Sequence, residues 1–254
     1  MPAEVQVDVD DGVMVVTVNR PQARNAITQP VAAAIAAAFD ELDASGELMA
    51  AVLTGAGGTF CSGRDLKAAL AGDHPGVARR GFAGMVEYGS AKPLIAAVEG
   101  YALGGGFEIV LACDLVVSAA SARFGLPEVR RGRIAGAGGL LRLPRRVPHH
   151  IATELALTGE PMTAERAAHF GLVNRLTADG RALEEAVALA RQIAENGPLA
   201  VAATKRVISE GGDWPAGEAF ERQRPISEAI RASEDAVEGA RAVADKRKPV
   251  WRNR

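Results

Sequence analysis

The sequence has few of the residues that mark disulfide-rich or metal-binding proteins. Its 254 residues include 2 cysteines and 4 histidines. Two cysteines, Cys61 and Cys113, in a chain of this length favour reduced thiols in a cytosolic protein over a disulfide framework. His149 and His150 are adjacent, so on a helix they diverge, and no third ligand is spaced near them. The sequence therefore predicts no metal site.

An excess of charge of one sign and a long apolar run are also lacking. The formal net charge is −2, with both signs mixed along the chain, which excludes the basic footprint of a nucleic-acid-binding protein. The longest apolar run, residues 31–39, is too short to span a bilayer. The first residues show neither the basic region nor the apolar region of a secretory signal. We therefore expect a cytoplasmic protein with no membrane partner and no nucleic-acid partner.

Hydrophobic residues, by contrast, make up 48% of the chain, which is ample for a sizeable core. Alternating residues around Asp10-Asp11-Gly12 predict a β-hairpin. Residues 77–90 have the spacing of a helix, and short apolar runs predict buried strands at residues 49–54, 94–98 and 115–118. This alternation of strand and helix predicts a largely parallel sheet in an α/β layer fold.

After about residue 148 the sequence shows mainly helical spacing, punctuated by glycine and proline. We expect a core of residues 1–190 and a helical region of residues 191–254. That region is too thin to hold a core alone, so we expect it to pack on the main body or on a neighbouring subunit.

Residues 100–108, Gly-Tyr-Ala-Leu-Gly-Gly-Gly-Phe-Glu, are the leading candidate for chemistry. Glycine lets the backbone approach a ligand closely, and the first N–H groups of a helix are free to bind an anion. The Rossmann spacing and the Walker Gly-Lys-Ser/Thr are both absent, which argues against a nucleotide phosphate loop. Tight packing of a helix on a strand is the alternative explanation of these glycines.

Two carboxylates accompany the glycines. Glu108 lies in an apolar run, where a carboxylate must be paired, solvated by a cavity or functional, and the first turn of a helix favours its ionised form. Glu128 follows Pro127, and its simpler interpretation is a carboxylate at a helix N-terminus. If the two shared a water, one would hold a proton while the other stayed ionised. Such a pair suits the formation and protonation of an enolate.

Two further glycine segments allow either a functional or a structural interpretation. Gly63 and Arg64 can present a second backbone N–H to the same oxygen as Gly105, or can form an ordinary loop. Residues 136–139, Gly-Ala-Gly-Gly, can pack against the site or merely begin a helix. No Gly-x-Ser-x-Gly motif is present, which argues against a serine hydrolase.

Together these motifs resemble the enoyl-CoA hydratase/isomerase (crotonase) family over nearly the whole chain. The residues that carry the resemblance are Asn-Arg-Pro at 19–21, Arg-Asn-Ala at 24–26, the stretches 57–66 and 92–108, Ala-Cys-Asp at 112–114, Phe-Gly-Leu-Pro-Glu at 124–128, Gly-Ala-Gly-Gly at 136–139, Leu-Thr-Gly at 157–159, residues 164–168 and Gly-Leu-Val at 171–173. Residues 140–144 and the tail at 233–251 are similar to the carnitinyl-CoA dehydratase branch in particular.

The resemblance implies a crotonase-like spiral of ββα units with a helical C-terminal trimerisation region that completes the acyl-CoA site. It implies a homo-trimer or hexamer, an acyl-CoA thioester substrate, and neither a metal nor a cofactor other than the coenzyme A of the substrate. The matching catalytic residues are Glu108 and Glu128, and the matching oxyanion-hole amides are those of Arg64 and Gly105. Further substrate-binding positions are Ser62, Gly63, Asp65, Leu66, Gly104 and Gly136.

The sequence departs from the family pattern on one side of the expected pocket. Arg131 and Arg133 replace residues that are commonly apolar, and Ala135 stands where proline is usual. A basic wall would favour a polar or acidic acyl chain. We predict an enoyl-CoA hydratase; a double-bond isomerase, a carnitinyl-CoA dehydratase-like enzyme and a non-catalytic acyl-CoA-binding protein are the alternatives. Which glutamate is the acid and which the base stays open.

Overall fold

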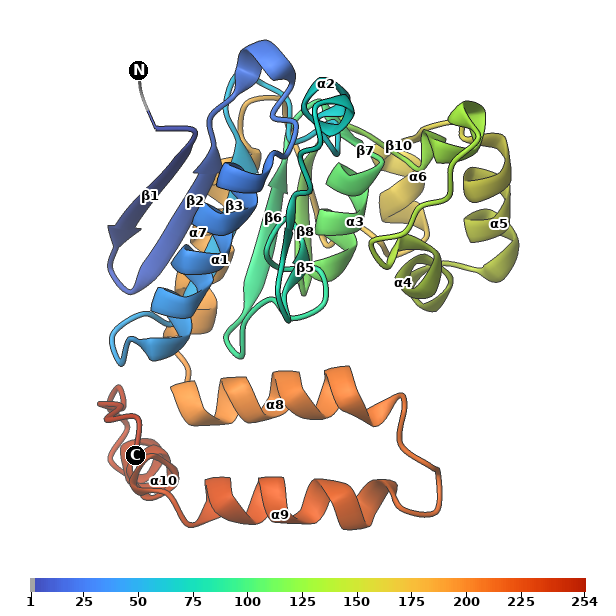
Figure 1. Cartoon of the computed structure of the whole chain (residues 1–254). Coiled ribbons are helices and arrows are strands. Elements are labelled where there is room, and N and C mark those ends of the chain that lie inside the picture. Colours follow the sequence, from blue (N-terminus) through green and yellow to red (C-terminus); the bar gives the residue numbers. More distant parts are fainter. Residues whose placement is uncertain (1–2) are drawn as a thin grey trace.

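The computed structural model describes residues 3–254, and its main body is built in layers around a six-stranded sheet (Figure 1). The strands, in spatial order, are β1 Val5–Asp10, β2 Val13–Val18, β3 Ala50–Gly55, β6 Leu94–Val98, β8 Leu115–Ala119 and β11 Arg175–Thr177. The β1–β2 hairpin is antiparallel, and the other four pairings are parallel. The predicted hairpin and the predicted α/β fold with a largely parallel sheet are confirmed.

Both faces of the sheet are covered by helices. Side chains alternate along a strand, so Met14 and Val16 of β2 join the core on the side of helix α1, Gln29–Ala44. Val13 of the same strand joins a second cluster, which includes apolar residues of helix α7, Ala182–Ala194. Burial on both faces explains why the central strands are continuous apolar runs.

A small second sheet positions the two glutamates. Its strands, in spatial order, are β10 Met162–Thr163, β9 Arg123–Gly125 and β7 Tyr101–Leu103. Strands β7 and β9 are parallel and in register, so their carboxyl ends lie at the same edge. Helix α3, Gly105–Ala112, follows β7, and the 3-10 helix η2, Pro127–Arg131, follows β9. Residues twenty apart in the sequence are thereby brought to one site.

The predicted helix over residues 77–90 is wrong. This segment contains two short paired strands, β4 Gly76–Val77 and β5 Gly81–Phe82, followed by turns. The backbone at Gly81 and Gly84 has φ values of +70° and +68°, which a right-handed helix does not allow. A Cβ on Gly84 would lie 2.3 Å from the carbonyl oxygen of Ala32, so the turn packs directly on α1. Close packing on α1 therefore overrides the helical spacing.

The last three helices lie outside the layers. Helices α8, Pro198–Gly211, and α9, Ala219–Arg231, run side by side below the body in Figure 1, and α10, Glu234–Ala244, follows them. Helices α8 and α9 contribute no buried residue. The boundary predicted at residue 190 falls within α7, and the division into two regions stays a prediction. The shorter elements are η1 Pro21–Ala23, α2 Leu66–Leu70, α4 Gly139–Arg146, α5 His149–Thr158 and α6 Ala164–His169.

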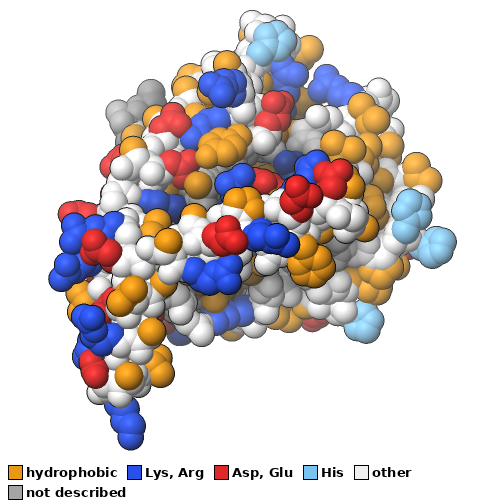
Figure 2. Space-filling view, turned by 90° about the horizontal axis from the view of Figure 1, so that it is seen from below, with side chains coloured by type: hydrophobic (Ala, Val, Ile, Leu, Met, Phe, Trp, Pro, Cys, Tyr) orange, Lys and Arg blue, Asp and Glu red, His pale blue; other side chains and the backbone are white. Residues whose placement is uncertain are grey.

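The surface seen from below carries no field of a single sign. Basic and acidic side chains are interspersed there, with hydrophobic side chains between them (Figure 2). Among residues 3–254, no helix combines the length and apolar character that crossing a membrane requires.

Candidate active site

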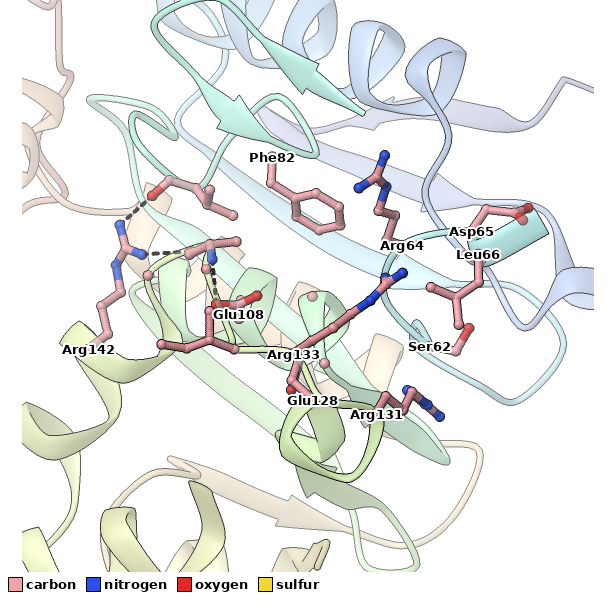
Figure 3. Close-up of a pocket in the computed structure, with 18 of the residues that line it drawn as sticks. Ser62, Arg64, Asp65, Leu66, Phe82, Glu108, Glu128, Arg131, Arg133 and Arg142 are labelled. Carbon is pink, nitrogen blue, oxygen red and sulfur yellow. Dashed lines mark hydrogen bonds between the residues drawn. The ribbon is translucent and has the colours of Figure 1, made fainter. Parts of the chain in front are cut away.

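An open pocket of about 1380 Å³ lies where the two sheets meet the loops that follow them (Figure 3). Its walls come from the loops around α2, from residues 82–87, from the start of α3, and from η2 with the loop that leads into α4. Both predicted glutamates and both predicted oxyanion residues, Arg64 and Gly105, line it. The structure thus gathers into one cavity residues that are spread widely over the sequence.

Two backbone N–H groups in the pocket are available to a ligand. Gly63 O accepts a hydrogen bond from Ile27 N at 2.8 Å, and Asp65 N donates to Ile27 O at 3.0 Å. The amide between them, Arg64 N, faces the opposite way, because successive backbone groups of an extended strand alternate in direction. Gly105 is the first residue of α3, where no helical acceptor exists for its N–H.

Glycine at positions 63 and 105 permits the close approach of these two segments. A Cβ on Gly63, where φ is +94°, would lie 2.9 Å from Gly105 N and 3.0 Å from the carbonyl oxygen of Leu103. A Cβ on Gly105 would lie 2.6 Å from the ring of Phe82. The two amides are therefore packed side by side, with an aromatic ring against Gly105. This arrangement would exclude water from an oxygen that bound both N–H groups.

Glu108 is buried in the pocket wall and held by a loop. Its side chain is 3% exposed, and its Oε1 accepts hydrogen bonds from Ala137 N at 2.7 Å and Gly139 N at 2.9 Å. Burial raises the pKa of Glu108, and the two N–H groups and the nearby Arg142 offset this only in part. The expectation that the helix terminus would favour the ionised form is therefore corrected, because desolvation has the larger effect.

Glu128 faces the same cavity from the first turn of η2 (Figure 3). Burial raises its pKa, and the negative charge of Glu108 raises it further. A Cβ on Gly104, where φ is +56°, would lie 2.9 Å from Glu128 Oε1, so the carboxylate lies directly against the backbone at the start of α3. Its other oxygen, Oε2, is buried and has no hydrogen-bond partner among residues 3–254. A buried carboxylate oxygen without a partner calls for an explanation, and a proton held on Glu128 or a donor from a bound substrate would supply one.

Arg142 of α4 holds the loop whose amides bind Glu108 (Figure 3). Its guanidinium donates hydrogen bonds to Ala137 O, at 3.4 Å, and to Val86 O on the facing wall. A Cβ on Gly138 would lie 2.1 Å from Arg142 Nη1, so the guanidinium rests directly on the loop backbone. Arg142 thereby connects two pocket walls and places a positive charge near Glu108.

The remaining predicted positions differ in their surroundings. Ser62, Leu66, Gly104 and Gly136 line the pocket, as does Asp65. The Asp65 carboxylate is already engaged: it accepts from Lys67 N and Ala68 N at 3.1 Å each and pairs with Arg20, and these contacts lower its pKa. Asp65 therefore caps α2, and its carboxylate is not free for a substrate. The substrate-binding role of these positions stays a prediction.

Sequence reasoning missed several members of the site. The segment with Phe82 is predicted to be a helix, and Arg142 is not among the predicted residues. Residues 136–139 do pack against the site, as one of their two interpretations expects, but the prediction did not include hydrogen bonds from Ala137 N and Gly139 N to Glu108. A signal existed for the amides, because a buried carboxylate needs donors and a glycine-rich loop supplies them. Residues 3–254 contain no group of three or more metal-ligating side chains. Both cysteines are buried, and burial raises the pKa of each to about 12, so both stay thiols.

Burial of Glu108 has a consequence for stability. Its pKa is higher in the folded protein than the ordinary value of 4.5, so its ionisation destabilises the fold above that pH and has little effect below it. We expect Glu108→Gln to raise the melting temperature at neutral pH, and to raise it less near pH 4.5. Glutamine keeps an oxygen for the two N–H donors.

The measurement is thermal unfolding at the two pH values. Glu47→Gln, at an exposed loop position, is the matched control and should show no such difference. A lower melting temperature for Glu108→Gln at neutral pH would show that the carboxylate stabilises the fold.

Comparison with known proteins decides the family. The model of the enoyl-CoA hydratase/isomerase family matches residues 8–254. The chain belongs to that family. The carnitinyl-CoA dehydratase of Salmonella typhi is 41% identical over 250 residues, which cover 95% of each protein. The resemblance seen in the sequence, including that to the carnitinyl-CoA dehydratase branch, is confirmed.

Solved structures of other family members confirm the crotonase-like fold. An enoyl-CoA hydratase from Mycobacterium tuberculosis H37Rv is 51% identical and superposes with a TM-score of 0.97 over 99% of each chain. A carnitinyl-CoA hydratase from Mycobacterium avium is 46% identical, with a TM-score of 0.79 over 99% of each chain. This family member is therefore an enzyme related to hydratases and dehydratases that act on acyl-CoA thioesters.

Proposed function

We propose that the protein is an enoyl-CoA hydratase, which adds water across the double bond of a trans-2-enoyl-CoA thioester. The observation that carries the proposal is the pair of carboxylates, Glu108 and Glu128, facing one cavity beside two available amides. Hydration needs both a base and an acid, and the two glutamates can supply them. One carboxylate activates the water, and the other delivers a proton.

The proposed mechanism uses the pocket groups in the following steps. The thioester oxygen binds Arg64 N and Gly105 N, which stabilise the negative charge that develops on it as the enolate forms. Water held by the two glutamates attacks C3, and one of them takes the water proton. The other glutamate gives a proton to C2, and the enolate collapses to the 3-hydroxyacyl thioester. The proton count balances, because one proton enters the pair and one leaves it.

The raised pKa values suit both roles. A carboxyl group whose pKa lies nearer to neutrality is a better acid and a better base at that pH than an ordinary glutamate. Besides burial, the charge of Glu108 raises the pKa of Glu128, so the two carboxylates titrate as a coupled pair in which a proton on one favours ionisation of the other. Either glutamate can hold that proton in this arrangement.

The test is a panel of 2-enoyl-CoA and 3-enoyl-CoA thioesters of several chain lengths, with product identified by mass spectrometry. We expect 3-hydroxyacyl-CoA from the 2-enoyl substrates. A double-bond isomerase would instead convert 3-enoyl-CoA faster than it hydrated 2-enoyl-CoA, and needs only one base. A non-catalytic acyl-CoA-binding protein would bind the panel and convert none of it.

The C-terminal helices support a further proposal, that the protein is a homo-trimer or a hexamer. Ile208, Phe220 and Val243 are 75%, 82% and 81% exposed in the single chain. Apolar side chains of this exposure favour an interface between subunits. We expect light scattering after size exclusion to give the mass of three or six chains at micromolar concentration; the mass of one chain would contradict it. We also propose that the enzyme acts in the cytoplasm with its coenzyme A substrate.

A further inference from the structure

Arg131 and Arg133 place positive charge on the pocket wall that follows Glu128. Both line the pocket, and both are exposed to it. Among residues 3–254, neither side chain forms an ion pair or donates a hydrogen bond. Their neighbour Arg130 differs, because it donates to Thr158 O at 3.0 Å and pairs with Glu160 outside the pocket. No carboxylate in the described part of the chain therefore lies within ion-pair distance of either guanidinium, although Arg131 is close enough to Glu128 to lower the pKa of that carboxyl.

The other basic residues that line the pocket differ from Arg131 and Arg133 in their partners. Arg64 on the opposite wall donates to Asp73 O and contacts His74 Nδ1 at 3.2 Å. Arg142 is held by the loop carbonyls, and Arg145 pairs with Asp213 at 2.9 Å. Arg24 and Lys67 also line the pocket, Lys67 from α2. With the proposed function, these two are the cations left to bind the phosphates of coenzyme A.

The reaction geometry places the acyl tail on the arginine side. The thioester carbon lies at the amides of Arg64 and Gly105, so the carbons C2 and C3 lie at the glutamates. The sulfur and coenzyme A extend in the other direction. Arg131 lies one turn of η2 beyond Glu128, and its charge lowers the pKa of that carboxyl. The Arg133 side chain extends from the Glu128 side of the pocket toward Arg64 (Figure 3). Substituents beyond C3 would therefore meet these two guanidinium groups.

We propose that Arg131 and Arg133 select enoyl-CoA substrates whose acyl tail ends in an anionic group, a carboxylate in particular. The inference rests on the proposed hydratase function. The same charges disfavour a tail that carries a trimethylammonium group, as a carnitinyl group does. The protein thus differs in acyl preference from the carnitinyl-CoA dehydratases to which it is 41% identical.

The experiment compares three 2-enoyl-CoA thioesters of equal chain length, with a terminal methyl, carboxylate or trimethylammonium group. We expect kcat/KM to be highest for the carboxylate and lowest for the trimethylammonium, with about tenfold between them, because an exposed charge pair changes affinity by up to about fivefold and two arginines act. Raising the salt concentration should narrow the ratio, since these charges are screened.

The Arg131→Gln/Arg133→Gln double variant should bring the three kcat/KM values to within about twofold of one another. Arg133→Glu should reverse the order of the two charged substrates. Arg181→Gln removes an exposed arginine remote from this pocket and should leave the order unchanged.

Two results would overturn the proposal while leaving the hydratase function intact. In one, the double variant hydrates all three thioesters with the wild-type preference. In the other, the double variant has a KM raised by the same factor for all three thioesters, which would show that the arginines bind the phosphates of coenzyme A. Failure of the wild-type protein to hydrate any of the three would instead contradict the hydratase function itself.

Discussion

Replacing either Glu108 or Glu128 with glutamine should lower kcat for hydration of a trans-2-enoyl-CoA by about 10²–10⁴-fold, the usual contribution of one general acid or base. Glutamine keeps the shape of glutamate but cannot take up a proton from water or deliver one to C2. KM should change little, because the substitution keeps the shape of the side chain and removes proton transfer, which acts in the transition state. Steady-state kinetics of the two single variants measures the effect.

The double variant Glu108→Gln/Glu128→Gln should lose less activity than the product of the two single losses, because the pair acts on one water. Glu87→Gln is a suitable control, since Glu87 also lines the pocket but is exposed. A near-silent substitution of one glutamate, with a strong effect of the other, would indicate the isomerase. Wild-type hydration by a folded Glu108→Gln variant would refute the mechanism with two carboxylates.

Substitution of Gly63 by alanine should lower kcat by about 10²–10³-fold, the usual loss when one oxyanion-hole donor is removed. The new Cβ would lie 2.9 Å from Gly105 N and 3.0 Å from Leu103 O, both backbone atoms that cannot move without displacing α3 or β7. The amides of Arg64 and Gly105 would then separate. Hydration kinetics and binding of a non-hydrolysable enolate analogue should both show the loss.

Gly72→Ala separates this effect from backbone strain. Gly72 has φ +90°, close to the +94° of Gly63, but a Cβ there meets no atom within 4 Å. Both variants pay the strain of alanine in a left-handed conformation, so both should unfold at a lower temperature. Only Gly63→Ala should lose kcat. Equal kcat for Gly63→Ala and the wild type would show that the two amides do not act together on the substrate.

The sequence brought out the candidate catalytic residues more readily than the elements that hold them together. Glu108 was recognisable because a carboxylate in an apolar run must have a reason to be there. Glu128 alone fitted a carboxylate at a helix N-terminus, and it became a candidate as the partner of Glu108. The parallel pairing of β7 with β9, which brings the two together, was not readable, since it depends on contacts between segments about twenty residues apart. The expected direction of the Glu108 pKa was wrong for a related reason: burial is a tertiary property, and it outweighs the local effect of the helix terminus.

The segment of residues 77–90 shows that apolar spacing alone does not determine whether a helix forms. Its apolar spacing fits a helix, yet Gly84 packs against Ala32 of α1 and the chain turns instead. Because of this error, two contacts of the site were not predicted. Phe82 packs against Gly105, and Arg142 donates a hydrogen bond to Val86 O. Both contacts join parts of the chain that are distant in sequence. Such contacts become visible only in three dimensions.

The most direct test of the proposed chemistry is the fate of solvent atoms during turnover. The wild-type protein is incubated with a trans-2-enoyl-CoA in heavy-oxygen water, and separately in heavy water, and the product is examined by mass spectrometry and NMR. Hydration by the glutamate pair predicts one solvent oxygen at C3 and one solvent hydrogen at C2 of a 3-hydroxyacyl thioester. A product that contains solvent hydrogen but no solvent oxygen, with the double bond moved, would contradict the hydratase and identify an isomerase.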